Sequence, residues 1–235
     1  MSAKPVLKLD WCSHAAAKYA VEHWHYSKGL PTPPLVKIGV WESGTFLGCV
    51  LFSRGANNNL CCRYHIFITE ICECTRVALA PHQHPVSRIL RIAVAMVRQT
   101  NSGLRLVVSY ADPNHDHHGG IYQALGWIYD GQTAADFAAI DRHGRRWHSR
   151  QVSRTGVKRQ YGRYRHVPKT SECTLVPLLG KYRYCYPLDA AMRAQILPLA
   201  QPYPKRAVST AASAPIVQMG EGGSSPTTAL RDEDL

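Results

Sequence analysis

The stretch 104–131, LRLVVSYADPNHDHHGGIYQALGWIYDG, is the most informative part of this sequence. An apolar run ends at Asp112, a polar loop rich in histidine follows, and a short helical pattern then carries Tyr122. Open α/β sheets bind ligands at the carboxyl ends of their strands. An Asp at such an end, faced by a Tyr, therefore predicts a functional site. We expect the Asp112 carboxylate and the Tyr122 phenol to converge in one pocket.

The rest of the chain predicts an α/β (α+β) domain with a mixed sheet flanked by helices and a basic C-terminal extension. Apolar periodicity and turn residues mark the elements. In chain order they are a helix over 13–24 capped by Ser13, a hairpin of 35–41 and 45–52, a long strand over 66–80, a helix over 86–99, a strand over 106–109, a helix over 121–125 and a strand over 127–129. A second hairpin of 137–140 and 147–152, a strand over 182–186 and a helix over 188–199 follow.

The domain organisation follows from these patterns. We expect a core over 1–135, a basic extension over 136–203 that completes the domain, and a disordered tail over 204–235. The sequence has neither a run of about 18 apolar residues nor a signal peptide. Its eight cysteines are therefore predicted to be reduced thiols, and the protein to be cytoplasmic.

The chain is strongly basic, with a formal net charge of +12 and a pI of about 9.5. Such an excess favours a polyanionic partner, most often nucleic acid, although association with a ribosome or a membrane surface also fits. Ten cations occur between 142 and 169 without one acidic residue, and Trp147, Tyr161 and Tyr164 are interleaved with them. A solvated face is the plain alternative to DNA binding. The predicted DNA contacts are Arg142, Arg145, Arg146, Trp147, Arg150, Arg154, Lys158 and Arg159.

The order of the predicted elements is that of the GNAT acyltransferase fold. Several motifs together narrow this likeness: HYSK at 25–28, TRVAL at 75–79, SR at 87–88, SYADP at 109–113 and GIYQA followed by GW at 120–127. In this order they resemble the Mom family of phage DNA-modification proteins. The resemblance covers about 11–131 well and extends loosely to about 187.

The resemblance implies an enzyme that adds a carbamoylmethyl (acetamido) group to adenine N6 in double-stranded DNA and so protects phage DNA from host restriction. It implies catalytic roles for His25, Tyr26, Asp112 and Tyr122, and donor or phosphate binding by Arg76, with Ser87 and Arg88 opening the next helix. Iron held by Tyr26, Asp112 and Tyr122 is a further implication. The group donor and the oligomeric state stay open, with a homodimer as one option.

One segment departs from the acyl-CoA enzymes of the GNAT fold. Those enzymes hold a pyrophosphate on the backbone amides of a glycine-rich loop at a helix N-terminus. Here the corresponding loop, PHQHPVSR at 81–88, has no glycine and has two prolines, which lack an amide donor. The sequence therefore argues against acyl-CoA bound in the usual manner.

The chemistry suits these residue types, although each has a structural interpretation as well. Asp112 could accept the N6 proton, Tyr122 could donate one, and His25 could shuttle protons. Alternatively, Asp112 caps a turn before a proline, Tyr122 packs in the core, and His25 is a satisfied core histidine. An inward Arg76 needs an anion, and a salt bridge to Glu70 or Glu73 is the structural option.

The histidines at 82, 84, 115, 117 and 118 invite a metal interpretation, but their spacing matches no ligand pattern, and a solvated loop is favoured. Cys72 and Cys74 share one strand face and are predicted to be buried thiols. Three functions stay open: DNA adenine modification, an acyl-CoA-dependent N-acetyltransferase acting on a protein or small amine, and a DNA-binding protein without chemistry.

Overall fold

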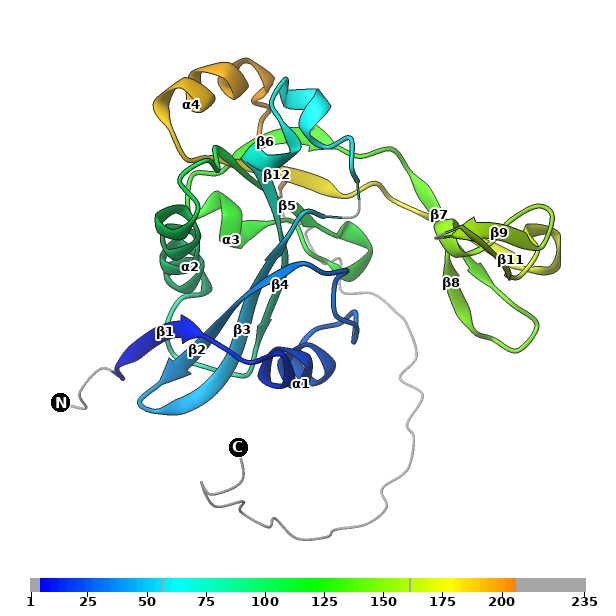
Figure 1. The fold of residues 1–235 in the computed structure, drawn as a ribbon, viewed down its shortest axis with the longest axis horizontal. Coiled ribbons are helices and arrows are strands. Elements are labelled where there is room, and N and C mark those ends of the chain that lie inside the picture. Colours follow the sequence, from blue (N-terminus) through cyan, green and yellow to red (C-terminus); the bar gives the residue numbers. More distant parts are fainter. Residues whose placement is uncertain (1–4, 56, 161, 206–235) are drawn as a thin grey trace, which may run out of the picture.

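A seven-stranded mixed sheet forms the centre of the molecule, and the computed structural model describes residues 5–55, 57–160 and 162–205 (Figure 1). The strand order is β1-β2-β3-β4-β5-β12-β6, and β4 and β5 are its parallel pair. The strands are β1 Leu7–Trp11, β2 Leu35–Glu42, β3 Thr45–Ser53, β4 Ile71–Leu79, β5 Leu106–Ala111, β6 Ile128–Gln132 and β12 Tyr182–Pro187. This mixed sheet with its flanking helices confirms the predicted GNAT-like fold class.

The two longer helices, α1 His14–Trp24 and α2 Val86–Thr100, pack on opposite faces of this sheet. Successive residues of β3 point to opposite faces, so Val50 joins the core under α2 while Cys49 joins the core under α1. The Ser13 hydroxyl accepts a hydrogen bond from the Ala16 amide at 3.1 Å, as predicted for the cap of α1. Two shorter helices come later in the chain: α3 Gly120–Gln123 follows β5, and α4 Ala190–Ile196 follows β12.

The sheet opens where β4 and β5 separate. Their ladder ends at the pair Cys74 and Ser109, after which the two strands diverge. On the other side of β4, the register with β3 shifts, so that Leu51 faces Arg76 while Phe52 faces Cys74, and Thr75 is the extra residue. A bulge of this kind bends a strand and increases its twist. We call the point where β4 and β5 separate the fork.

Residues 136–178 form small sheets outside the central one, which we call the appendage (Figure 1). One sheet has the order β11-β7-β8, made of β7 Asp136–Ile140, β8 Arg146–His148 and β11 Thr174–Leu178. The other is the antiparallel pair β9 Val157–Gln160 and β10 Arg163–His166. Two segments join the appendage to the core, and Thr133 and Lys181 connect them through reciprocal hydrogen bonds of 2.9 and 2.8 Å.

Several boundaries differ from the sequence prediction. The long strand expected over 66–80 begins only at Ile71, because 68–70 form a 3-10 turn. β1 and β9 to β11 were not predicted, and β12 lies between β5 and β6 in the core sheet, so part of 136–203 returns to the core. Of the tail expected over 204–235, everything after 205 lies outside the described residues. In the described ranges, no helix has the length and apolarity needed to cross a membrane.

Candidate active site

Asp112 directly follows β5 at the fork and is held by two partners. Its Oδ1 atom accepts hydrogen bonds from the backbone amide and the side-chain amide of Asn114, at 3.0 and 2.8 Å. Its Oδ2 atom lies 3.2 Å from the Lys181 ammonium. Burial acts to raise the pKa of Asp112, but the Asn114 hydrogen bonds and the Lys181 charge outweigh it and lower the pKa. The turn-capping interpretation is therefore correct for Oδ1, while Oδ2 is a carboxylate oxygen that stays ionised.

Tyr26 supplies the solvent-exposed side of the site. Its side chain is 43% exposed, and its ring lies between those of His25 and His115, at centroid distances of 4.4 and 4.2 Å. The His117 ring meets Tyr26 edge-on at 5.5 Å. Burial raises the pKa of the Tyr26 phenol, and the Asp112 charge acts in the same direction. This side of the site therefore offers a neutral aromatic surface.

His25 follows α1 and is neutral at physiological pH. Burial, followed by the neighbouring Arg76 charge, lowers the pKa of His25 to about 4. Its Nδ1 atom accepts the Ser27 amide proton at 3.1 Å, which assigns the ring proton to Nε2. His25 can therefore act as a neutral donor or acceptor, but not as an acid already charged at pH 7.

Arg76 follows the bulge in β4, and its charge acts on both His25 and Tyr26. Its guanidinium donates to the carbonyl oxygens of Thr75 and Gly29, at 2.7 and 3.4 Å. Burial lowers the pKa of Arg76, while the nearby Tyr26 and Glu73 act to raise it. The alternative partner Glu70 instead lies 3.7 Å from Arg105. Both of these hydrogen bonds of the Arg76 cation go to backbone oxygens.

Tyr122 lies deeper in the fork than Asp112. Its hydroxyl is 2.7 Å from the Ser109 hydroxyl, which is itself 2.7 Å from the Cys74 carbonyl oxygen. Its ring packs against Trp127 in the main core, and the residue is 7% exposed. Burial raises the pKa of the Tyr122 phenol strongly. The core interpretation therefore describes its ring. The Tyr122 hydroxyl and the Asp112 carboxylate, which were expected to converge, have different hydrogen-bond partners.

The iron ligand set implied by the resemblance includes Tyr122, whose hydroxyl is hydrogen-bonded to Ser109. Tyr26 and Asp112 influence each other electrostatically, but the Tyr122 hydroxyl belongs to the hydrogen-bonded chain at the fork. Ligation by all three would require that chain to break and a strongly protonated phenol to lose its proton. Within the described residues, no three or more His, Cys, Asp or Glu side chains form a metal-binding group. The iron set stays a prediction, and we derive no chemical step through it.

The loop between β4 and α2 is occupied by a carboxylate of the chain itself. The amides of Gln83 and His84 both point at the Glu42 carboxylate, at distances of 3.3 to 3.4 Å. His84 is buried and bonds the Pro5 carbonyl oxygen at 2.8 Å. Of the predicted donor-binding residues, Ser87 lies in the first turn of α2, and Arg88 contacts His84 at 3.5 Å. Two amides that could face a pyrophosphate thus already face an anion.

All eight predicted DNA contacts lie on the appendage, and six of them are fully exposed. Trp147 is not one of these six, because the Arg145 guanidinium covers its ring at 4.1 Å and its indole nitrogen donates to Asp141 at 2.8 Å. Tyr164, by contrast, is 76% exposed. Tyr161 lies outside the described residues. Tyr164 is therefore the available aromatic surface among these three.

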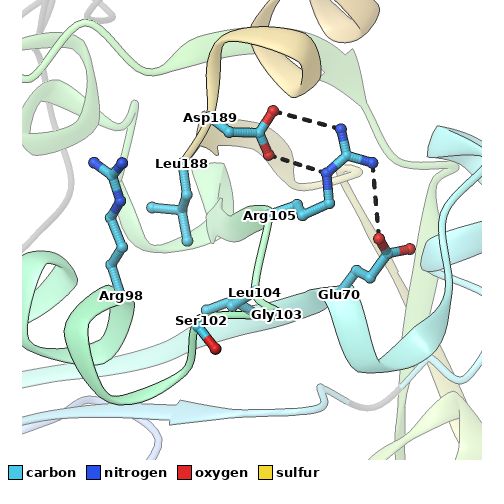
Figure 2. A pocket seen from close by; sticks show the side chains of 8 residues that line it. All are labelled: Glu70, Arg98, Ser102, Gly103, Leu104, Arg105, Leu188 and Asp189. Atoms are coloured by element: carbon cyan, nitrogen blue, oxygen red, sulfur yellow. Dashed lines mark hydrogen bonds and ion pairs between the residues drawn. The ribbon is translucent and has the colours of Figure 1, made fainter.

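A pocket of about 550 Å³ lies at the opposite end of β5 from Asp112. It surrounds the residues that precede this strand, whereas Asp112 follows it (Figure 2). Figure 2 shows Arg105 bonded to Asp189 and paired with Glu70 across it. These charges satisfy each other, so we do not assign chemistry to this pocket.

Two residues of the site were not predicted from the sequence. Asn114 has a local signal, because an Asp or Asn near a proline commonly forms such turns. Lys181 has none, because it reaches Asp112 from the segment after β11, far along the chain. Asn114 also exchanges a pair of 3.0 Å hydrogen bonds with the Leu179 backbone. The Asp112 site is therefore fastened directly to the base of the appendage.

No curated protein matched the sequence. Among solved structures, the chain is similar to FeeM, an N-acyl amino acid synthase from uncultured soil microbes, with 11% identity, 81% of this chain and 94% of that chain covered, and a TM-score of 0.44. It is also similar to the spermidine/spermine N-acetyltransferase SpeG from Vibrio cholerae, with 10% identity, coverages of 82% and 96%, and a TM-score of 0.42. The model of the Mom protein family matches residues 6–205, and the chain therefore belongs to the Mom protein family.

Proposed function

We propose that this chain modifies adenine in double-stranded DNA by adding a carbamoylmethyl group to N6. Family membership supports adenine modification in general. The observation that carries the specific proposal is the ionised Asp112 carboxylate beside the exposed ring of Tyr26. An acceptor and an aromatic surface at one sheet edge are what a purine amine requires. The biological consequence would be protection of the DNA from restriction.

The carboxylate addresses the main chemical difficulty of this reaction. Adenine N6 is a poor nucleophile because its lone pair is delocalised into the ring. An Oδ2 atom of Asp112 that accepts a hydrogen bond from N6 would orient the amine toward a donor that carries a leaving group on its carbamoylmethyl carbon. As N6 forms the bond to this carbon, the bond to the leaving group would break and its electron pair would depart with that group, while Asp112 takes the N6 proton. Its lowered pKa makes Asp112 a weak base, so proton transfer accompanies bond formation and does not precede it.

The aromatic residues and cations address the position of the base. An enzyme that acts on a base of a duplex extrudes it from the stack at a cost of a few kcal/mol. Tyr26 and the imidazole rings packed against it form a partly exposed aromatic cluster that the extruded base can contact, and the appendage cations can hold the flanking phosphates. Arg76 would bind an anionic part of the donor or of the extruded nucleotide.

The acyl-CoA-dependent N-acetyltransferase is the alternative, and the loop between β4 and α2 argues against it. Gln83 and His84 direct their amides to Glu42, and the two prolines of this loop have no amide to donate. Acetyl transfer would also not give the proposed product, because the carbamoylmethyl group is joined to N6 through a methylene.

Mass spectrometry of nucleosides from DNA of an expressing host tests the proposal. We expect a modified deoxyadenosine whose mass fits the added carbamoylmethyl group, and none in a host without the gene. DNA binding without any altered nucleoside would support a DNA-binding protein that lacks the chemistry, and would refute the proposal.

A further inference from the structure

Among the described residues, no third strand pairs with β9 and β10, and we call this pair the ribbon. It forms a sheet of its own, with Arg163 opposite Gln160 and His166 opposite Val157. All four residues of β10 are exposed, and because successive side chains point to opposite faces, both faces of β10 are open to solvent. A two-stranded sheet on its own is only marginally stable in water. The ribbon therefore has the features of an element that is completed by a ligand.

Both faces of the ribbon carry positive charge. Residues directly opposite in an antiparallel pair share a face, so Lys158 and Arg165 lie on one face, and Arg159 and Tyr164 lie on the other. The described residues of the ribbon include no Asp or Glu. Lys158 also donates to the Arg150 carbonyl oxygen, which fastens the ribbon to the neighbouring turn. A ribbon that lay flat on a polyanion would use only one of these faces.

From this arrangement we infer that the ribbon enters the major groove of duplex DNA, with one face toward each phosphate backbone. This inference rests on the proposed function. Sheets stack about 10 Å apart, which sets the thickness of one strand layer with its side chains. That thickness fits the major groove, which is about 12 Å wide, and exceeds the minor groove at about 6 Å. The cations of each face then meet the phosphates of one strand.

The position of adenine N6 in the duplex also favours an approach from the major groove. Adenine presents N6 and N7 in the major groove, whereas its minor-groove edge presents only N3. A protein that acts on N6 therefore gains from holding the duplex by the groove that displays it. The exposed Tyr164 also brings an aromatic side chain into that groove, next to Arg159.

The test uses the full-length protein and three duplexes of one sequence: unmodified, with glucosylated 5-hydroxymethylcytosine filling the major groove, and with netropsin bound in the minor groove. We expect binding to the glucosylated duplex to be at least 10-fold weaker, and binding to the netropsin complex to be unchanged. Loss of binding with netropsin, together with tolerance of glucosylation, would overturn the inference.

A pair of variants tests the ribbon itself. Arg159→Ala with Arg165→Ala removes one cation from each face, and the control, Arg91→Ala with Arg98→Ala, removes two exposed cations from α2. Each neutralised phosphate contributes about 0.9 to the slope of log K against log salt, so the ribbon variant should lower that slope by about 1.8 and the control should leave it unchanged. Equal slopes in the two variants would overturn the inference.

The two proposals can fail separately. Nucleoside mass spectrometry of hosts expressing the same variants reports on the proposed function. If the wild type modifies adenine and the ribbon variant binds and modifies as well as the control, only the groove inference is wrong. If the wild type binds DNA through the ribbon but yields no modified nucleoside, only the proposed chemistry is wrong. Thermal melting of each variant establishes that it is folded.

Discussion

Replacing Lys181 with methionine isolates the electrostatic control of Asp112. The ammonium lies 3.2 Å from Asp112 Oδ2, and methionine keeps the length of the side chain while removing its charge. In the wild type, burial acts to raise the pKa of Asp112, and Asn114 and Lys181 together lower it. Without Lys181, burial opposes only the Asn114 hydrogen bonds. The pKa of Asp112 should therefore rise.

The magnitude follows from Coulomb's law. Two unit charges 3.2 Å apart attract by about 1.3 kcal/mol at the dielectric constant of water and by about 5 kcal/mol at an effective value of 20. The Lys181 side chain is 46% exposed, so solvent screening places the value near the lower figure. Since 1.36 kcal/mol corresponds to one pH unit, we expect the midpoint of Asp112 to move up by about one pH unit.

Carbon-13 NMR of protein labelled at the aspartate carboxyl carbons measures this midpoint directly, and the signal lost in Asp112→Asn assigns the resonance. A carboxylate with a lowered pKa stabilises the fold above its unfolded-state pKa, and this contribution disappears as the pH falls. The free energy of unfolding of Lys181→Met should therefore also decrease less than that of the wild type as the pH falls. Lys181→Arg retains the charge and is the control. An unmoved midpoint in Lys181→Met, or an equal change in both variants, would refute the electrostatic argument.

Three further predictions concern the fork, the core and the donor loop. Tyr122→Phe removes the hydroxyl that is hydrogen-bonded to Ser109 but keeps the ring, so the free energy of unfolding in urea should fall by about 1 kcal/mol. We expect nucleoside modification to fall less than 10-fold. Complete loss of modification would instead indicate a chemical role for the phenol. Asp130→Ala leaves Arg63 and Arg183 without their buried carboxylate and should lower the free energy of unfolding by about 3–5 kcal/mol in the same assay. A decrease below 1 kcal/mol would show that these two ion pairs add little to stability. Acetyl-CoA should not raise the melting temperature, because Glu42 occupies the loop amides; clear stabilisation would favour the N-acetyltransferase alternative.

The elements with strong apolar periodicity were the predictable ones. The cap of α1 and the boundaries of α1 and α2 came close to the observed ones because Ser13 and the apolar spacing are local signals. On α2, Leu90 and Val94 are buried, whereas Ile92 and Met96 are only partly buried. Which side of a helix meets a sheet depends on the tertiary packing, which periodicity alone does not determine.

The elements that were missed are short and polar. β9 and β10 carry charges on both faces, so no alternation marks them as strands. The insertion of β12 between β5 and β6 is a matter of nonlocal pairing, which no residue of β12 encodes by itself. Lys181 was missed for the same reason. Asp112 and Tyr26 were identified from local motifs, but their hydrogen bonds and stacking partners became evident only with the fold.

The most direct test of the central claim compares wild type with Asp112→Asn in one expression host. The asparagine is almost the same size but carries no charge and is a poor proton acceptor. The amount of carbamoylmethylated deoxyadenosine is measured by mass spectrometry, and the affinity for duplex DNA is measured on the purified proteins. We predict that the modified nucleoside disappears in Asp112→Asn while the DNA affinity is unchanged. Undiminished modification by Asp112→Asn would contradict the account.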